Sequence, residues 1–133
     1  MNISDFKKSL AEITGSARFL AQLDVLDVEF ASGHSLELYV ASSLDDQVRG
    51  LSNLTDIDVD GMLFYFKTKT YKPFSMKDML FDLDVAWYDD TGKLLDVASF
   101  EAGNETPVYA KYGYRYVIET RKGSLPFADL KVK

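Results

Sequence analysis

From residue 25 onward, apolar and polar positions alternate along the chain with a period of two. In the first such stretch, Leu26, Val28 and Phe30 alternate with acidic residues, and Ser32-Gly33 then interrupts the pattern. Alternation of this kind is typical of a strand with one buried face, and a short Ser-Gly interruption is typical of a hairpin turn. The pattern predicts about seven strands, at 25–30, 36–40, 62–66, 71–77, 83–89, 94–100 and 114–120.

Two segments have helical spacing instead. Apolar residues recur every three or four positions over residues 4–14, which predicts an amphipathic N-terminal helix. After the first hairpin, Ser42 or Ser43 is placed to cap a second, short helix that runs through Arg49. We therefore expect an α+β fold dominated by an antiparallel, barrel-like sheet. The expected division is a helix and connector at residues 1–24, followed by one β-barrel domain at 25–133.

Composition narrows the possible functions. The net charge of −6 and the scattered Lys and Arg residues argue against nucleic-acid binding. The chain has no cysteine and one histidine, His34, in a predicted turn, so thiolate chemistry and His-based triads or zinc sites are not expected. No apolar run reaches the roughly 18 residues of a membrane span. The N-terminus does not read as a signal peptide, so we expect a protein that is not exported and does not enter a membrane.

Five short motifs, in order, resemble those of one family. Val48-Arg49-Gly50-Leu51 is similar to its Arg-Gly-Leu-Met segment, and the stretch 74–79 is similar to its Phe-Trp-Met-Lys-Asn-Thr segment. The other three matches are Gly61–Phe66 with Gly-Met-Leu-Phe-x-Phe, Leu83–Trp87 with Pro-Leu-Asp-Ile-Ala-Phe, and Tyr116–Glu119 with Tyr-Ala-Leu-Glu. Over about residues 25–132 the chain resembles the DUF192 family, a domain of unknown function.

The chain departs from the family motifs at several positions. Ser75 stands where the motif has tryptophan, Asp78 where it has asparagine, and Asp82 where it has proline. Many relatives resemble exported bacterial proteins with a leader, whereas this chain has its predicted N-terminal helix there. That helix either packs on its own domain or mediates assembly with a partner chain. A compact version without a leader would also suit a bacteriophage gene, and hence a location in a virion.

Carboxylates gather near the motif at 74–79. Asp82 and Asp84 are two apart in an extended segment, so both side chains are expected on one face, with Asp78 nearby. They could form a hard-cation site or hold a general acid with a raised pKa. Alternatively, they line a solvated sheet face and pair with Lys77 or Arg115.

Arg49 has two open interpretations. It either pairs with Glu119 or Asp84 inside the fold, or it anchors a carboxylate or phosphate ligand. Because a short helix that caps a barrel must cross a rim, we expect Arg49, Lys77, Asp78 and Asp84 to share one rim.

Two glycine-containing patterns bear on metals and backbone. Asp56-x-Asp58-x-Asp60-Gly61 imitates the start of a calcium loop, but position 12 is Lys67 instead of glutamate. We interpret it as an acidic surface loop, and we predict no metal site and no cofactor. Gly61 precedes a buried strand, and we expect it to adopt a positive φ.

These observations favour a non-catalytic domain that binds a small ligand or a protein. One alternative is a structural component of a bacteriophage virion or other assembly. Another is a small hydrolase or lyase that uses Asp78, Asp82 and Asp84, although the chain has no cysteine and no serine in a nucleophile-elbow setting. No catalytic residue is assigned. The candidate ligand-binding residues are Arg49, Lys77, Asp78, Asp82 and Asp84.

Overall fold

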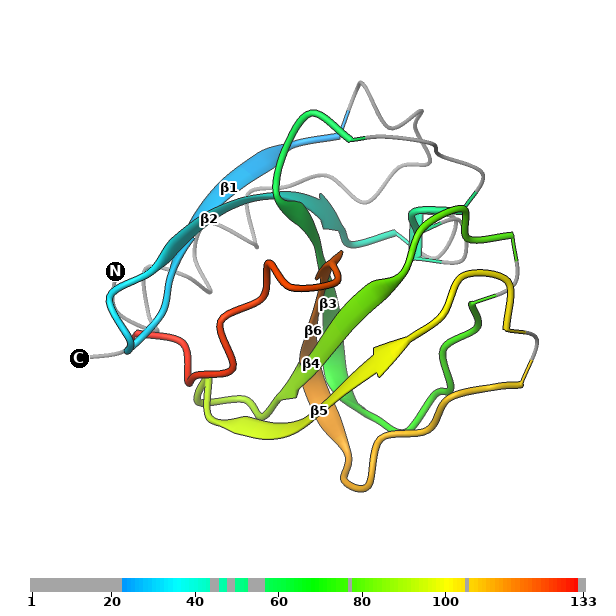
Figure 1. Cartoon of the computed structure of the whole chain (residues 1–133). Helices are drawn as coiled ribbons and strands as arrows, with labels where there is room; N and C mark the ends of the chain where they lie inside the picture. The colour runs from blue at the N-terminus through cyan, green and yellow to red at the C-terminus, as the bar shows by residue number, and fades with distance from the viewer. Residues whose placement is uncertain are drawn as a thin grey trace.

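A computed structural model describes residues 23–43, 46–47, 50–52, 57–76, 78–104 and 106–131. Within these ranges the chain forms six strands in a single sheet (Figure 1). The strands are β1 (Val25–Glu29), β2 (Ser35–Ala41), β3 (Gly61–Thr70), β4 (Leu83–Tyr88), β5 (Leu94–Phe100) and β6 (Tyr114–Arg121). Six of the seven predicted strands are confirmed, with ends that differ by a few residues.

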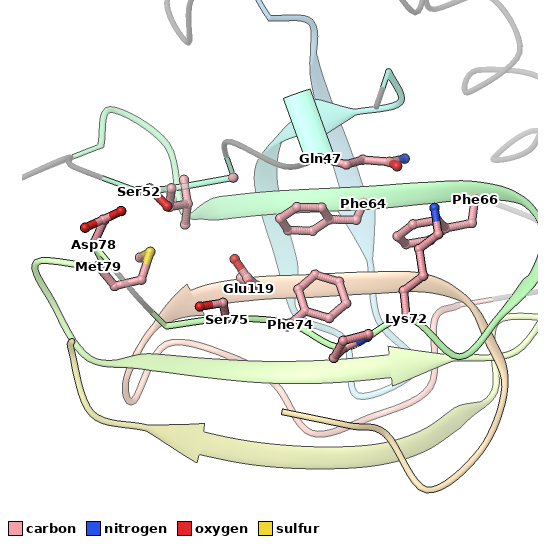
Figure 2. Close-up of a pocket in the computed structure, with 13 residues that line it drawn as sticks. Gln47, Ser52, Phe64, Phe66, Lys72, Phe74, Ser75, Asp78, Met79 and Glu119 are labelled. Carbon is pink, nitrogen blue, oxygen red and sulfur yellow. The ribbon is translucent and has the colours of Figure 1, made fainter. Parts of the chain in front are cut away.

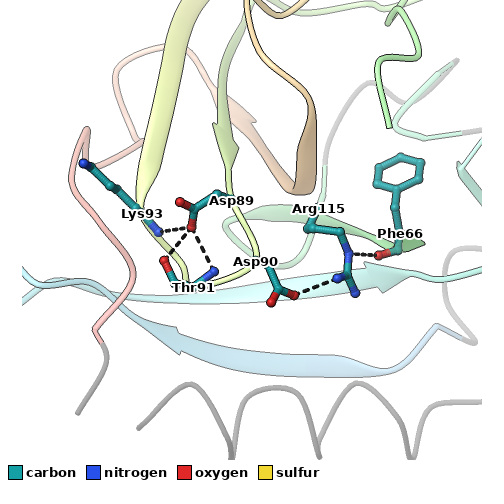
Figure 3. A network of polar contacts seen from close by, with 6 residues as sticks. All are labelled: Phe66, Asp89, Asp90, Thr91, Lys93 and Arg115. Atoms are coloured by element: carbon teal, nitrogen blue, oxygen red, sulfur yellow. Dashed lines mark hydrogen bonds and ion pairs between the residues drawn. The ribbon is translucent and has the colours of Figure 1, made fainter. Parts of the chain in front are cut away.

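A tight turn joins the two strands of each hairpin. Gly33 has φ 93° between β1 and β2, and Gly92 has φ 88° between β4 and β5, a conformation that glycine adopts without steric cost. In the second turn the Asp89 carboxylate accepts hydrogen bonds from Thr91 and from the Lys93 amide (Figure 3). Burial opposes ionisation of Asp89, but these hydrogen bonds outweigh it and lower its pKa.

The prediction of an α+β, barrel-like antiparallel fold is wrong. The strand order is β1-β2-β3-β6-β4-β5, so β1 and β5 are the outermost strands and do not pair with each other, and the sheet stays open. The pairing of β2 with β3 is parallel, while the other pairs are antiparallel. A parallel pair needs a crossover connection, which here is the stretch 42–60. The described fold is therefore all-β.

Helical structure contributes little to the described residues. No helix is defined in them, and only Asp46 and Gln47 have helical backbone after the first hairpin. Ser43 does cap this turn, because its hydroxyl accepts a hydrogen bond from the Asp46 amide at 3.1 Å. The predicted N-terminal helix at residues 4–14 lies outside the described residues. No helix in the described part of the chain is long and apolar enough to cross a membrane.

The one predicted strand that is not confirmed, at 71–77, is also wrong. Among its described residues only Phe74 makes a strand-like contact, an isolated bridge with Val108 that has hydrogen bonds of 2.7 Å in both directions. Pro73 lacks an amide hydrogen and cannot take part in a regular ladder. The segment instead passes over one face of the sheet, where the Lys72 carbonyl accepts a hydrogen bond from the Tyr114 hydroxyl at 2.5 Å.

Both faces of the sheet are covered by apolar packing. The first face carries Phe64, Trp87 and Val117 from the three central strands. Leu51, Phe74, Met76 and Met79 cover it. The second face carries Leu63, Tyr88 and Ile118 in the same strands, and Leu125 and Leu130 from the C-terminal segment cover it. The candidate site lies on the first face, between the sheet and its covering segment.

Candidate functional site

A cavity of about 370 Å³ opens on the first face of the sheet (Figure 2). Its floor is formed by β3 and β6. One wall comes from the turn after β2, and the other comes from the covering segment, which we define as residues 72–76 and 78–79. The described lining residues are Gln47, Gly50, Leu51, Ser52, Phe64, Phe66, Lys72, Pro73, Phe74, Ser75, Asp78, Met79 and Glu119.

Glu119 is the buried acid of this cavity. In the sheet it lies between Met62 of β3 and Val85 of β4, so its lateral neighbours are apolar. The residue is 5% exposed, and within the described part of the chain no hydrogen bond or ion pair reaches its carboxyl group. Because burial disfavours the charged form, the pKa of Glu119 is raised to about 8. Near neutral pH the group is therefore mostly a neutral carboxylic acid that can donate a hydrogen bond.

Aromatic rings form the apolar part of the cavity. Phe64 and Phe74 meet edge to face, with ring centroids 5.3 Å apart and an interplanar angle of 85°. Phe74 also packs against Trp87, the single tryptophan, at 6.5 Å. Edge-to-face packing fixes the orientation of both rings, so the cavity has a preformed aromatic wall.

Gln47 holds the opposite wall in place. Its side-chain amide donates a hydrogen bond to the Tyr65 carbonyl at 2.6 Å and another to the Ala41 carbonyl at 3.3 Å. These bonds tie the turn after β2 to the end of β2 and to the middle of β3. The cavity wall is therefore anchored to the sheet.

Asp78 lines the cavity in a left-handed backbone conformation, with φ 65°. Aspartate and asparagine tolerate this conformation better than other non-glycine residues. The family motif has asparagine at this position, so the aspartate is compatible with the same backbone. The backbone conformation accounts for the residue type here without any appeal to a ligand.

We expect Asp78→Gly to leave stability unchanged or to raise it by up to about 1 kcal/mol, because glycine adopts a positive φ without strain. Asp78→Val should lower stability by roughly 1–2 kcal/mol, because a β-branched residue is strained there. Urea unfolding of the two variants and the wild type would measure both changes. Equal losses in the two variants would show that the aspartate side chain matters more than its backbone.

The structure separates the predicted site residues. Asp78 lines the cavity, but Asp82 and Asp84 do not. The Asp82 carboxylate accepts a hydrogen bond from the Ala102 amide at 2.9 Å, at the end of β5. Arg49 and Lys77 lie outside the described residues, so the shared rim stays a prediction for them. Arg115, one expected partner of these acids, instead pairs with Asp90 at 2.7 Å (Figure 3).

Asp84 holds the second face of the sheet together. It is 4% exposed, and its carboxylate accepts hydrogen bonds from the Ser99 hydroxyl and from the Gly123 amide, the latter at 2.8 Å. These partners belong to β5 and to the turn after β6. Alternation along β4 puts Asp84 on the opposite face from Val85, and hence away from the cavity.

Asp84→Ala is expected to lower the free energy of unfolding by about 2 kcal/mol, because hydrogen bonds to a buried charged group are lost. Asp90→Ala is the control, since it removes a half-exposed ion pair that should contribute less than about 1 kcal/mol. Chemical denaturation at neutral pH measures both. An Asp84→Ala variant as stable as Asp90→Ala would contradict the structural role.

The described residues of the acidic loop before β3 stabilise the fold. The Asp60 carboxylate accepts a hydrogen bond from the Glu37 amide of β2 at 2.7 Å. Asp56, the first position of the calcium-like pattern, lies outside the described residues. Within those residues no group of three or more His, Cys, Asp or Glu side chains is placed to hold a metal.

The prediction that Gly61 adopts a positive φ is wrong. Gly61 is not among the glycines with positive φ. A Cβ at this position would instead lie 2.0 Å from the Glu119 carbonyl oxygen of the neighbouring strand β6. Close approach of two strands, and not a special backbone conformation, excludes a side chain here. The same contact fixes the backbone of Glu119.

Sequence reasoning did not select Glu119 or the three phenylalanines as site residues. A signal for Glu119 was present: it follows Val117 at a spacing of two, so the two side chains lie on the same face of the strand. Ser75 was another signal, because a small residue at the position of a motif tryptophan leaves space beside the sheet. Neither signal alone distinguishes a buried acid from an exposed one.

Comparisons with known proteins place the chain in a family. A protein of unknown function from Novosphingobium aromaticivorans superposes with a TM-score of 0.74 at 21% identity, over 90% of this chain and 94% of that one. A Sinorhizobium meliloti protein, described as a candidate transcription regulator, gives 0.70 at 22% identity, over 79% and 89%. At these identities the likeness shows the fold alone.

The comparison with curated proteins finds no match. The family model of DUF192, described as "Uncharacterized ACR", matches residues 27–133, which confirms the resemblance seen in the five motifs. This match spans every strand of the sheet apart from the first two residues of β1. The chain therefore belongs to the DUF192 family.

Proposed function

We propose that the protein is a non-catalytic domain that binds a small organic ligand in the cavity on the first face of its sheet. The observation that carries this proposal is Glu119, a buried carboxyl group at the cavity floor that no described residue pairs. A carboxyl group that lines a cavity can exchange hydrogen bonds with a ligand there.

The shape and lining of the cavity support the same proposal. Small-molecule sites are concave, mostly apolar, and carry a few polar groups that orient the ligand. Here Phe64, Phe66 and Phe74 supply the apolar surface, and Glu119 and Asp78 supply polar groups. A volume of about 370 Å³ is at the lower end for such sites and suits a ligand of the size of one substituted ring.

Ser75→Trp provides the test. Ser75 lines the cavity, and the family motif has tryptophan at this position, so the larger side chain should fill the space without changing the fold. We would record ¹⁵N–¹H spectra of both proteins with a mixture of small aromatic alcohols, amines and carboxylates. Wild type should show shifts at the Glu119, Ser75 and Gln47 amides, and Ser75→Trp should show none.

Tyr109→Ala is the matched control, because Tyr109 is 66% exposed and lies outside the cavity lining. This variant should respond as the wild type does. If no compound in the mixture shifts the cavity amides of the wild type, or if Ser75→Trp responds equally, the ligand-binding proposal fails.

A second candidate is a carboxylate-dependent hydrolase or lyase with Glu119 as the general acid. The observation in its favour is the pKa of about 8, since a general acid must hold its proton near neutral pH. Asp82 and Asp84 would take no part, because they bond elsewhere. Turnover of p-nitrophenyl esters or glycosides that disappears in Glu119→Gln would establish catalysis in place of simple binding. The assembly role stays a prediction that no contact described here tests.

A further inference from the structure

We infer that the ligand of this cavity carries an organic ammonium group, which binds between the Glu119 carboxyl group and the aromatic wall of Phe64 and Phe74. This inference rests on the proposed binding function and names the class of its ligand. Three features of the cavity carry it: a buried acid that no described residue pairs, ring surfaces that attract cations, and the position of the other charges.

The first feature is the acid itself. Glu119 projects from β6 into the space between Phe64 on β3 and the covering segment with Phe74 and Ser75 (Figure 2). Its lateral neighbours in the sheet, Met62 and Val85, offer no hydrogen bond and no opposite charge. A buried carboxylate is stabilised only by a cation or by donors, and the described chain supplies neither. A ligand cation is the complement that the described residues do not supply.

The second feature is the aromatic wall. The face of a phenylalanine ring carries partial negative charge, so it attracts a cation and disfavours an anion. Phe64, Phe66 and Phe74 all line the cavity, and the edge-to-face contact between Phe64 and Phe74 holds two of these rings in different planes. A carboxyl group beside differently oriented rings is the arrangement that recognises alkylammonium groups in proteins.

The third feature is the distribution of the remaining charges. The titratable groups among the described lining residues are Lys72, Asp78 and Glu119. Figure 2 places Lys72 and Asp78 at opposite ends of the covering segment, with Phe74 and Ser75 between them. Asp78 therefore adds negative charge at one end of the cavity, while Lys72 is remote from it. An ammonium group is favoured at the Asp78 end, and the chain's net charge of −6 acts in the same direction.

Binding of an ammonium ion has a proton balance that can be measured. In the free protein Glu119 is protonated at pH 7, because burial raises its pKa to about 8. When an ammonium group binds beside it, the carboxyl group gives its proton to the buffer and pairs with the ligand as a carboxylate. No other bond is made or broken. Binding should release close to one proton per ligand at about pH 6, and fewer as Glu119 ionises at higher pH.

The experiment compares benzylammonium, benzyl alcohol and phenylacetate by isothermal titration calorimetry at pH 7, in two buffers of different ionisation enthalpy. Benzylammonium and benzyl alcohol have nearly the same shape, so their affinity ratio isolates the charge. We expect benzylammonium to bind about tenfold or more tightly than benzyl alcohol, with proton release. In Glu119→Gln the preference and the proton release should both disappear.

Glu101→Gln is the matched control, since it makes the same substitution at an exposed position outside the cavity and should keep the preference. Equal or tighter binding of benzyl alcohol or phenylacetate at the cavity amides would overturn the ammonium inference and leave the binding function standing. Binding of benzylammonium without proton release, or unchanged in Glu119→Gln, would also overturn it. If none of the three probes shifts a cavity amide, and the aromatic mixture shifts none either, both the inference and the proposed function fail.

Discussion

Gly61→Ala is expected to lower the free energy of unfolding by about 3 kcal/mol, at the upper end of the range for overpacking substitutions. The added Cβ would lie 2.0 Å from the Glu119 carbonyl oxygen and 3.1 Å from the Thr120 Cα, both in the backbone of β6. A backbone atom cannot turn aside as a flexible side chain can. The central pair β3 and β6 must therefore separate at this point, and hydrogen bonds between these strands must be lost.

Gly103→Ala is the control for this substitution. Gly103 has φ 76° and no atom within 4 Å of an added Cβ, so alanine there carries only the strain of the backbone conformation, roughly 1 kcal/mol. Urea unfolding monitored by the fluorescence of Trp87 would measure both variants. A Gly61→Ala variant that is no less stable than Gly103→Ala would show that the two strands can separate without cost. It would also remove the steric explanation for this glycine.

Glu119→Gln is expected to stabilise the protein, and to do so increasingly as the pH rises. Burial raises the pKa of Glu119 from 4.5 to about 8 in the folded protein, so the folded state holds this proton more tightly than the unfolded chain does. Above pH 4.5 the unfolded chain ionises first, and the wild type loses stability until the pH exceeds the folded pKa. Between pH 5 and pH 8 the loss should be on the order of 3 kcal/mol. Glutamine does not ionise and avoids it.

The measurement is the stability difference between Glu119→Gln and the wild type, taken by urea unfolding at several pH values from 5 to 8. Taking the difference cancels the contribution of every other titrating group. The difference should be small at pH 5 and should grow towards pH 8. Glu101→Gln, which changes an exposed acid, should show no such growth. A difference that does not change with pH would mean that Glu119 is ionised in the folded protein or is open to water.

The same pH dependence links stability to the proposed binding. A protein that keeps a desolvated acid at a cavity floor loses stability at neutral pH, which a glutamine or an apolar residue would restore. Functional sites commonly carry groups that are unfavourable for stability. Ligand binding to the folded state offsets that loss by mass action, so benzylammonium should raise the unfolding temperature of the wild type more than that of Glu119→Gln.

The sequence by itself determined six strands and the turns of the two hairpins. The alternation in residues 25–30 and 36–40 places one apolar face on each strand, and Gly33 and Gly92 mark the two hairpins, because these signals depend only on neighbouring residues. The family followed from five short motifs in the correct order. Asp78 was singled out for its place in one of them, and it does line the cavity.

Tertiary structure alone decided how the strands meet. The parallel pairing of β2 with β3 and the position of β6 between β3 and β4 join segments that are distant along the chain. A period of two shows which residues share a face, but it does not show which strands are neighbours or whether the edges meet. The open sheet was therefore not distinguishable from a closed barrel in the sequence.

Tertiary structure also decided the candidate site. Alternation puts Glu119 on the same face of the sheet as Val117. Whether that face is buried or exposed to solvent depends on the covering segment at 72–76 and 78–79, which is not a strand. Asp84 is also buried, but it has two hydrogen-bond partners. These partners, Ser99 and Gly123, come from β5 and from the turn after β6. The chemistry of a carboxyl group depends on its burial and on its partners, and both are set by contacts between residues far apart in the chain.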